Sequence, residues 1–348
     1  MKKILFLLIS LPVILINSCR TDFDVNAEWE DISVVYCLLN PKDSVHYVKV
    51  NKVFLGEMDA YEMAKYSDSV NYEEATVVLE FYKDGMLEGS YQFVKTTDIV
   101  KEDGIFSTEN NIIYKYSGMI SSDGNYVLRI NIPGKEEITA ETNMISSLTV
   151  LNPQPGKRVN FAKYETPFIT KWKSSKNARL YEIAIYFKYY EIKDGGTPVL
   201  KTIKWVQPSE QSKTAAGDED MQQVINGQSF FNFVFATISA EEGYNDPSIK
   251  RVIKRKTFTF EFVLGGEDLN TFIEVNRPSN GIVQEKPAFT NINNGIGVFS
   301  CRFNHSLVGL ETFTGTIDSL HAGVITGGLN FMSEAETTVF WGNNPSLD

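Results

Sequence analysis

A succession of short alternating apolar runs, each ended by turn-forming residues, constrains this chain more than any other feature. In the first half of the chain the runs cover residues 32–39, 47–54, 75–82, 89–96, 112–117, 125–132, 138–143 and 148–151. Alternation of apolar and polar residues has the period of a half-buried strand, and sequences such as Lys83-Asp84-Gly85 favour hairpin turns. Strands that recur roughly every 8–12 residues predict an antiparallel β-sandwich.

The segment Asn152-Pro153-Gln154-Pro155-Gly156 interrupts this series. Two prolines and a glycine end a strand and stiffen the connection that follows. We therefore predict two domains, an N-terminal β-sandwich over residues 29–150 and a C-terminal β domain over residues 153–345.

The C-terminal part opens with a pattern typical of fibronectin type III-like sandwiches. A run ending in Trp172 is followed by a short turn and by the alternating run Tyr181–Phe187. We expect Trp172 to fill the space between two sheets, with Ile183 and Ile185 facing inward beside it. A strand is also predicted over residues 257–264.

A few helical insertions are expected in this mostly β chain. Residues 227–240 place Phe230, Phe231, Val234, Phe235 and Ile238 on one helical stripe. A second helix is predicted from residue 266 to 275, where acidic residues in the first turn suit the helix dipole. A helix-like insert also covers residues 57–66.

The N-terminus has the build of a secretory leader that ends at a cysteine. Lys2 and Lys3 precede an apolar run over residues 4–16, and Asn17 and Ser18 lead to Cys19. The run is too short for a comfortable bilayer span of ~20 residues. We predict a lipoprotein signal peptide over 1–18, acylation of Cys19 and a polar tether over 19–28. The alternative is an ordinary secretion signal with an incidental cysteine.

Charge limits the partners of this chain. The formal net charge is −11, and loss of the two leader lysines makes the mature chain more acidic still. An acidic surface argues against nucleic acid and anionic lipid as partners. The basic run between Lys250 and Lys256 is an exception, and we expect it to be a solvated loop and strand edge.

Two cysteines remain if Cys19 is acylated. Cys37 and Cys301 both lie in apolar runs, in what we predict to be different domains. A free cysteine behaves as a small buried hydrophobic residue, so we expect two buried thiols. A disulfide between them is the alternative, and it would need their Cα atoms within ~7 Å.

No catalytic or metal-binding spacing stands out. His46, His305 and His321 are isolated. The acidic residues Asp22 and Asp24, and the acidic run at 218–220, lack the order of a calcium loop. There is no G-x-S-x-G motif, and the glycine-rich residues 323–328 lack the lysine of a phosphate loop. We expect no enzyme activity and no cofactor.

The aromatic residues between Tyr186 and Tyr190, and Trp205, are typical of a sandwich core. Sugar binding by these side chains is the alternative.

Three segments carry a family resemblance. Residues 267–273, the pattern Asn-Ile-x-Asn-Gly-x-Gly-x-Phe at 291–299, and residues 315–320 resemble an uncharacterised family of Bacteroidota outer-membrane lipoproteins, a domain of unknown function. The resemblance implies genes beside energy-coupled nutrient receptors, and it carries over no catalytic residue. From the residues themselves, Gly295 and Gly297 suit a turn or close backbone approach, with a ligand site as the alternative.

The expected function is that of a lipid-anchored cell-envelope protein in the outer membrane. It would be a non-catalytic binding or accessory module beside an outer-membrane nutrient-uptake receptor, and the residues indicate no particular small-molecule or glycan ligand. One alternative is a surface adhesin or pilus-like structural subunit. Another is a hydrolase that acts on glycans or peptides.

Overall fold

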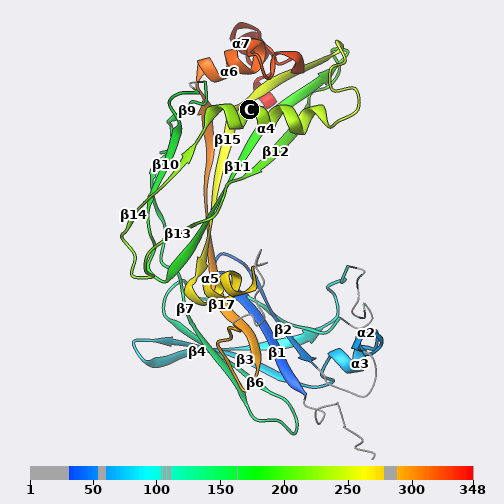
Figure 1. Ribbon diagram of the computed structural model, residues 1–348, viewed down its shortest axis with the longest axis vertical. Helices are drawn as coiled ribbons and strands as arrows, with labels where there is room; N and C mark the ends of the chain where they lie inside the picture. Colours follow the sequence, from blue (N-terminus) through cyan, green and yellow to red (C-terminus); the bar gives the residue numbers. More distant parts are fainter. Residues whose placement is uncertain are drawn as a thin grey trace, which may run out of the picture.

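The computed structural model describes residues 31–53, 60–102, 104, 107, 111–162, 164–277 and 288–347, without the side chains of residues 60 and 61. The predicted signal peptide, the tether, Cys19 and part of the insert at 57–66 lie outside the described residues. Strands make up 47% of the structure and helices 18%, so the predicted mostly β fold is confirmed. The strands form two bodies, one above the other in Figure 1.

The N-terminal body contains the strands predicted from the alternating runs. Its strands are β1 (Ile32–Leu39), β2 (Val45–Val53), β3 (Thr76–Lys83), β4 (Met86–Thr96), β5 (Ile113–Ser117), β6 (Asn125–Asn131) and β7 (Ile138–Asn143). The short helices α2 (Ala60–Met63) and α3 (Ser67–Val70) lie between β2 and β3. The strand order is β1-β2-β5-β4-β3-β6-β7, and β4 belongs to both layers because its two ends pair with different strands.

The C-terminal body has longer strands and most of the helices. Its strands are β8 (Thr149–Asn152), β9 (Arg158–Val159), β10 (Phe168–Lys173), β11 (Ala178–Lys193), β12 (Val199–Val206), β13 (Glu210–Gln211), β14 (Asp220–Ile225) and β15 (Ile249–Gly266). Its helices are α4 (Gly227–Ser239), α5 (Glu267–Asn276), α6 (Thr314–Ala322) and α7 (Glu334–Asn343), with single turns η2 (Gly327–Leu329) and η3 (Pro345–Leu347). The predicted helices at 227–240 and 266–275 are α4 and α5. Phe235, which the stripe places inside, is 37% exposed.

Trp172 fills the C-terminal sandwich as predicted. It lies on β10, in the three-stranded sheet β14-β10-β8, and its side chain is fully buried. The centroid of its ring lies 5.9 Å from that of Tyr181 on β11 and 6.0 Å from that of Phe262 on β15, so Trp172 bridges the two sheets. Ile183 and Ile185 are buried beside it. This is the packing that the fibronectin-like pattern predicts.

One strand joins the two bodies. β17 (Ile296–Thr312) follows the short strand β16 (Ile292–Asn293) and pairs in parallel with β1 over residues 296–301. From Arg302 to Leu310 the same strand pairs with β15 in the other body. The predicted division between 29–150 and 153–345 is therefore crossed, because residues 292–301 lie in the sheets of the N-terminal body. The parallel pairing also makes this sheet mixed, where an antiparallel one was expected.

Two glycines permit this crossing. Gly297 has φ +122°, and a Cβ atom there would collide with the carbonyl of Val35 on β1. A Cβ at Gly295 would lie 2.9 Å from the carbonyl oxygen of Ser33. The Asn291 side chain accepts from the amide of Phe299 and donates to its carbonyl, at 2.9 and 2.7 Å. The motif at 291–299 therefore has the structural role expected of turn and close-approach residues.

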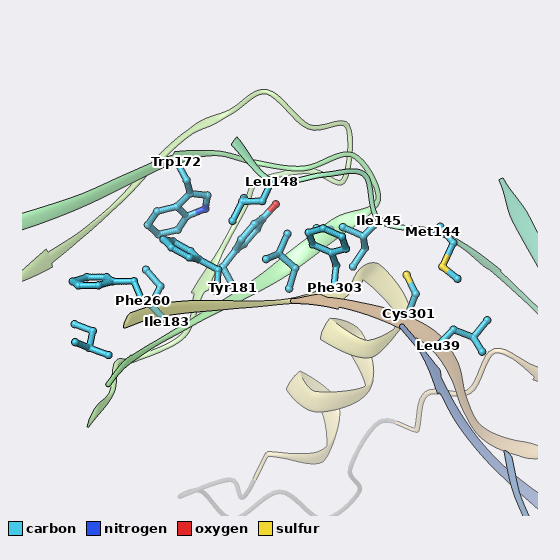
Figure 2. Close-up of a cluster of buried hydrophobic side chains, with 14 of the residues drawn as sticks. Leu39, Met144, Ile145, Leu148, Trp172, Tyr181, Ile183, Phe260, Cys301 and Phe303 are labelled. Carbon is cyan, nitrogen blue, oxygen red and sulfur yellow. The ribbon is translucent and has the colours of Figure 1, made fainter. Parts of the chain in front are cut away.

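The core runs through the junction between the bodies without a break. Figure 2 shows side chains from both bodies around β17, among them Leu39, Met144, Cys301, Phe303 and Trp172. All belong to one buried cluster. The two bodies are thus joined by shared apolar packing as well as by backbone pairing.

The two buried cysteines lie on neighbouring strands. Cys37 faces Phe299 in the register of β1 and β17, and Cys301 faces Leu39, so the expectation of separate domains was wrong. Both thiols are buried and free, as expected, and the disulfide alternative is not formed. Burial raises the pKa of the Cys301 thiol to about 11 and that of Cys37 further still.

Arg251 corrects the prediction for the basic run. The run lies within β15, and Arg251 is 1% exposed. Its Nε and Nη2 both lie 3.0 Å from the Glu191 carboxylate, and its Nη1 donates to the carbonyls of Leu329 and Tyr244 at 2.6 and 2.9 Å. A charge can be buried here because β11 and the C-terminal segment supply partners for it.

Replacement of Gly297 by alanine should destabilise the whole fold. The new Cβ would collide with β1 in a backbone region that disfavours L-residues, so we expect a loss on the order of 3 kcal/mol in the free energy of unfolding. Gly134→Ala is the matched control, because Gly134 has φ +81° with no atom within 4 Å of its Cβ position. It should cost only about 1 kcal/mol. Equal losses for both variants in urea denaturation would contradict the close approach.

Replacement of Arg251 by leucine should leave the Glu191 charge and two carbonyls without a donor. We expect a loss of about 3–5 kcal/mol, measured by chemical denaturation. Lys250→Leu changes the adjacent, exposed residue of the same strand and should shift stability by no more than about 0.5 kcal/mol. If the two variants were equally stable, the hydrogen bonds of Arg251 would not stabilise the packing of the C-terminal segment against β15.

Candidate functional site

A pocket lies on the outer face of β1 and β2, away from the core of the N-terminal body. Its volume is about 380 Å³. Its lining comes from β1, β2, α3 and the segment before β5: Val34, Tyr36, Lys49, Asn51, Lys52, Val53, Val70, Asn71, Lys101, Ser107 and Asn111.

Strand alternation puts these side chains on one face. In β2, His46, Val48 and Val50 are buried, whereas Lys49 and Asn51 point to the opposite side. In the register of β1 and β2, Tyr36 is opposite Lys49 and Val34 is opposite Asn51. The floor of the pocket is therefore two cross-strand pairs, each made of one residue from β1 and one polar residue from β2.

Hydrogen bonds hold α3 as one wall of the pocket. The Asn51 side chain donates to the carbonyl of Val70 at 2.7 Å and to Oδ1 of Asn71 at 3.2 Å. On the other side, the Tyr36 ring meets Phe272 of α5 edge to face at 6.0 Å. Figure 1 shows α3 beside β2 and α5 beside β17. The described lining of the pocket belongs to the N-terminal body, and α5 contacts it through the Tyr36 ring.

Lys49 is the distinctive residue of the pocket. Its Nζ donates to Oδ1 of Asn111 and to the carbonyl of Ile112, both at 2.7 Å. Within the described part of the chain, Lys49 forms no ion pair with a carboxylate. Burial and the nearby charge of Lys101 lower the pKa of Lys49 to about 8. Lys52 lies on the same strand with its Nζ over the Tyr72 ring. The pocket therefore gathers three lysines in an acidic chain.

The three histidines are not brought together. His46 is on β2, His305 on β17 and His321 on α6, and the described residues contain no group of three or more potential metal ligands. Burial lowers the pKa of His46 and of His305. Asp218 and Asp220 both pair with Lys173, while Asp22 lies outside the described residues.

The aromatic candidates for sugar binding are mostly core residues. Phe187, Tyr189 and Tyr190 are buried, and the Tyr186 hydroxyl donates to Glu261 at 2.8 Å. Trp205 stacks on Phe233 at 5.7 Å and packs at the edge of the core. The expected sandwich-core role therefore accounts for these side chains.

The pocket over β1 and β2 was not predicted from the sequence. The alternation of β2 places Lys49 on the polar face, but nothing in the sequence shows which groups surround it. Its partners at Asn111 and Ile112 follow more than sixty positions later.

Comparisons with known proteins do not identify a family for this chain. No family model and no curated protein matches the chain. It is similar to the crystal structure of DIP-gamma IG1+IG2, with 8% identity, a TM-score of 0.17, and coverage of 57% of this chain and 96% of that one. It is also similar to Drosophila OTK, extracellular domains 3-5, with 12% identity, a TM-score of 0.16, and coverage of 57% and 66%. Likenesses at this level carry no argument about function.

Among the helices described, none combines the length and the apolar character that a bilayer span requires.

Replacement of Lys49 by methionine should stabilise the protein most below a pH of about 8. The folded protein holds the Lys49 proton less tightly than the unfolded chain, whose lysine has the ordinary pKa of 10.5. Stability therefore rises with pH between these two values in the wild type, and the advantage of the methionine variant shrinks over the same interval. The free energies of unfolding of both proteins, measured by urea denaturation across that interval, test this.

Lys171→Met is the control, because Lys171 is an exposed residue on β10. It should change the free energy of unfolding by no more than about 0.5 kcal/mol. A stability difference for the Lys49 variant that stayed constant with pH, or grew as pH rose, would contradict the lowered pKa.

Proposed function

We propose that this chain is a lipid-anchored protein of the bacterial outer membrane and a non-catalytic binding or accessory module beside a nutrient-uptake receptor. The leader that ends at Cys19 and the family resemblance of residues 267–320 support the anchor and the location. The observation that carries the binding role is the pocket over β1 and β2, in which Lys49 has no acidic partner among the described residues.

The position of β1 suggests how such an anchor would orient the body. β1 begins at Ile32, and Asp31 before it accepts from the Tyr72 hydroxyl at 2.7 Å and pairs with Lys135 at 3.3 Å. A segment of a dozen residues spans at most ~40 Å. We therefore expect the N-terminal body to lie beside the bilayer. The helices α6 and α7 lie at the far end of the C-terminal body (Figure 1) and would face away from the bilayer.

The proposal of a binding role in place of catalysis rests on side-chain chemistry. The thiols of Cys37 and Cys301 are buried, and burial raises the pKa of both, which is the reverse of what a nucleophile requires. A pocket with one desolvated cation and apolar walls can hold a ligand without an acid and base pair around it.

Capture of a partner from outer membranes tests this function. The tagged full-length protein, solubilised from membranes of the native cells, should retain one outer-membrane receptor in stoichiometric amount. Cys19→Ser should lose both labelling by a radioactive fatty acid and the partner, whereas Cys37→Ser, which changes a buried cysteine of β1, should keep both. Recovery of the acylated protein without any stoichiometric partner would contradict the accessory role. Equal labelling of the Cys19 variant would contradict the anchor.

A further inference from the structure

We propose that the pocket over β1 and β2 binds a small amphipathic anion, a molecule with a carboxylate or sulfonate group and an apolar portion, with its acid group at Lys49. The inference deepens the proposed binding role and rests on it for its biological meaning. Its residues belong to the N-terminal body, so it can be tested without a receptor.

The Lys49 ammonium carries a charge that no carboxylate among the described residues balances. Lys49 is half-buried, and a cation withdrawn from water in a protein is usually paired with an anion, because desolvation of a lone charge costs much free energy. The ammonium of Lys49 has three protons, and two are donated to Asn111 and Ile112, which are neutral acceptors. Lys101 adds a like charge to the same pocket. An entering anion would therefore meet a donor whose charge the described residues leave uncompensated, in a setting that strengthens charge-assisted hydrogen bonds.

The size and polarity of the pocket walls favour a ligand with an apolar portion. Val34, Val53, Val70 and the Tyr36 ring give the pocket an apolar surface beside the lysines. A volume of about 380 Å³ falls within the range of ~300–1,000 Å³ that small-molecule pockets occupy. Inorganic phosphate or acetate would leave the apolar walls uncovered. The pocket thus favours an acid with a hydrocarbon or aromatic portion of a few carbon atoms or more.

Three other hollows of this body differ from the Lys49 pocket because acidic side chains line them. The hollow beside α3 and the one at the ends of β3 and β6 both contain Glu73 and Glu74, and a third contains Asp84 and Glu141. The described lining of the Lys49 pocket includes no aspartate or glutamate. In a chain with a net charge of −11, this surface is the one of the four that would attract an anion.

The pH dependence follows from the lysine. Burial lowers the pKa of Lys49 to about 8, so the ammonium persists at neutral pH and is lost as pH rises above that value. Binding of an anion stabilises the charged form and should itself raise the pKa of Lys49. Affinity for an anionic ligand should therefore be highest below that pH and fall above it.

Two fluorescent probes that share an aromatic body separate charge recognition from apolar binding. The mature chain carrying Cys19→Ser, which has no acyl chain to compete, is titrated with 1-anilinonaphthalene-8-sulfonate and with the neutral N-phenyl-1-naphthylamine. We expect one sulfonate site that octanoate displaces and octan-1-ol does not. Lys49→Met should weaken sulfonate binding by ~10-fold or more, whereas affinity for the neutral probe should change by no more than about twofold.

Two further variants control for folding and for general charge. Lys49→Arg keeps the cation and should retain sulfonate binding. Lys171→Met removes an exposed lysine from β10 and should leave binding unchanged. The proposal fails if the folded wild type binds no sulfonate probe at concentrations up to about 1 mM, if Lys49→Met binds it as well as the wild type, or if octan-1-ol displaces it as well as octanoate does.

The outcomes of this titration and of the receptor capture are distinguishable. A protein that captures a receptor yet binds no sulfonate probe would keep the accessory role and lose the anion site. A protein that binds the probe through Lys49 yet captures no receptor would keep the anion site and lose the accessory role.

Discussion

The parallel pairing of β1 with β17 holds the two bodies of this protein together. Six residues of β1 align with residues 296–301, and the same strand continues into an antiparallel pairing with β15. A single strand therefore belongs to both bodies, because its first part pairs with β1 and its later part pairs with β15. Backbone contact this close requires Gly297, and apolar packing around Cys301 and Phe303 fills the junction. Removal of that strand would expose the cores of both bodies.

The same pairing determines the pocket. β1 lies between β17 on one side and β2 on the other, so the side chains of Val34 and Tyr36 are fixed from both edges. Phe272 of α5, which follows β15, contacts Tyr36 and extends the covered surface next to the pocket. The pocket is lined by residues of the N-terminal body, but the position of β1 in it depends on β17, which lies much later in the chain.

Local patterns predicted most of the elements. The run at 32–39 forms β1 with the predicted bounds, and the Trp172 pattern predicted the sandwich because both depend on residues close in sequence. The joining of the bodies depends on partners far apart in the chain, and alternation alone cannot pair them. Arg251 was predicted to be solvated for the same reason, since its carboxylate partner Glu191 lies on another strand. The pocket was not predicted, because strand alternation places a lysine on the polar face but does not show whether a carboxylate lies near it in the fold.

Lys49 is a half-buried cation without a carboxylate partner among the described residues, in a pocket that we propose binds an anion. The most direct measurement is the pKa of this one side chain, followed by NMR of isotopically labelled lysine in the mature chain, with Lys49→Arg to assign its signal. We expect a pKa of about 8 for Lys49 in the free protein and a rise toward 10.5 when octanoate is added. A pKa near 10.5 in the free protein, or a pKa that octanoate does not change, would rule out the proposed role of Lys49.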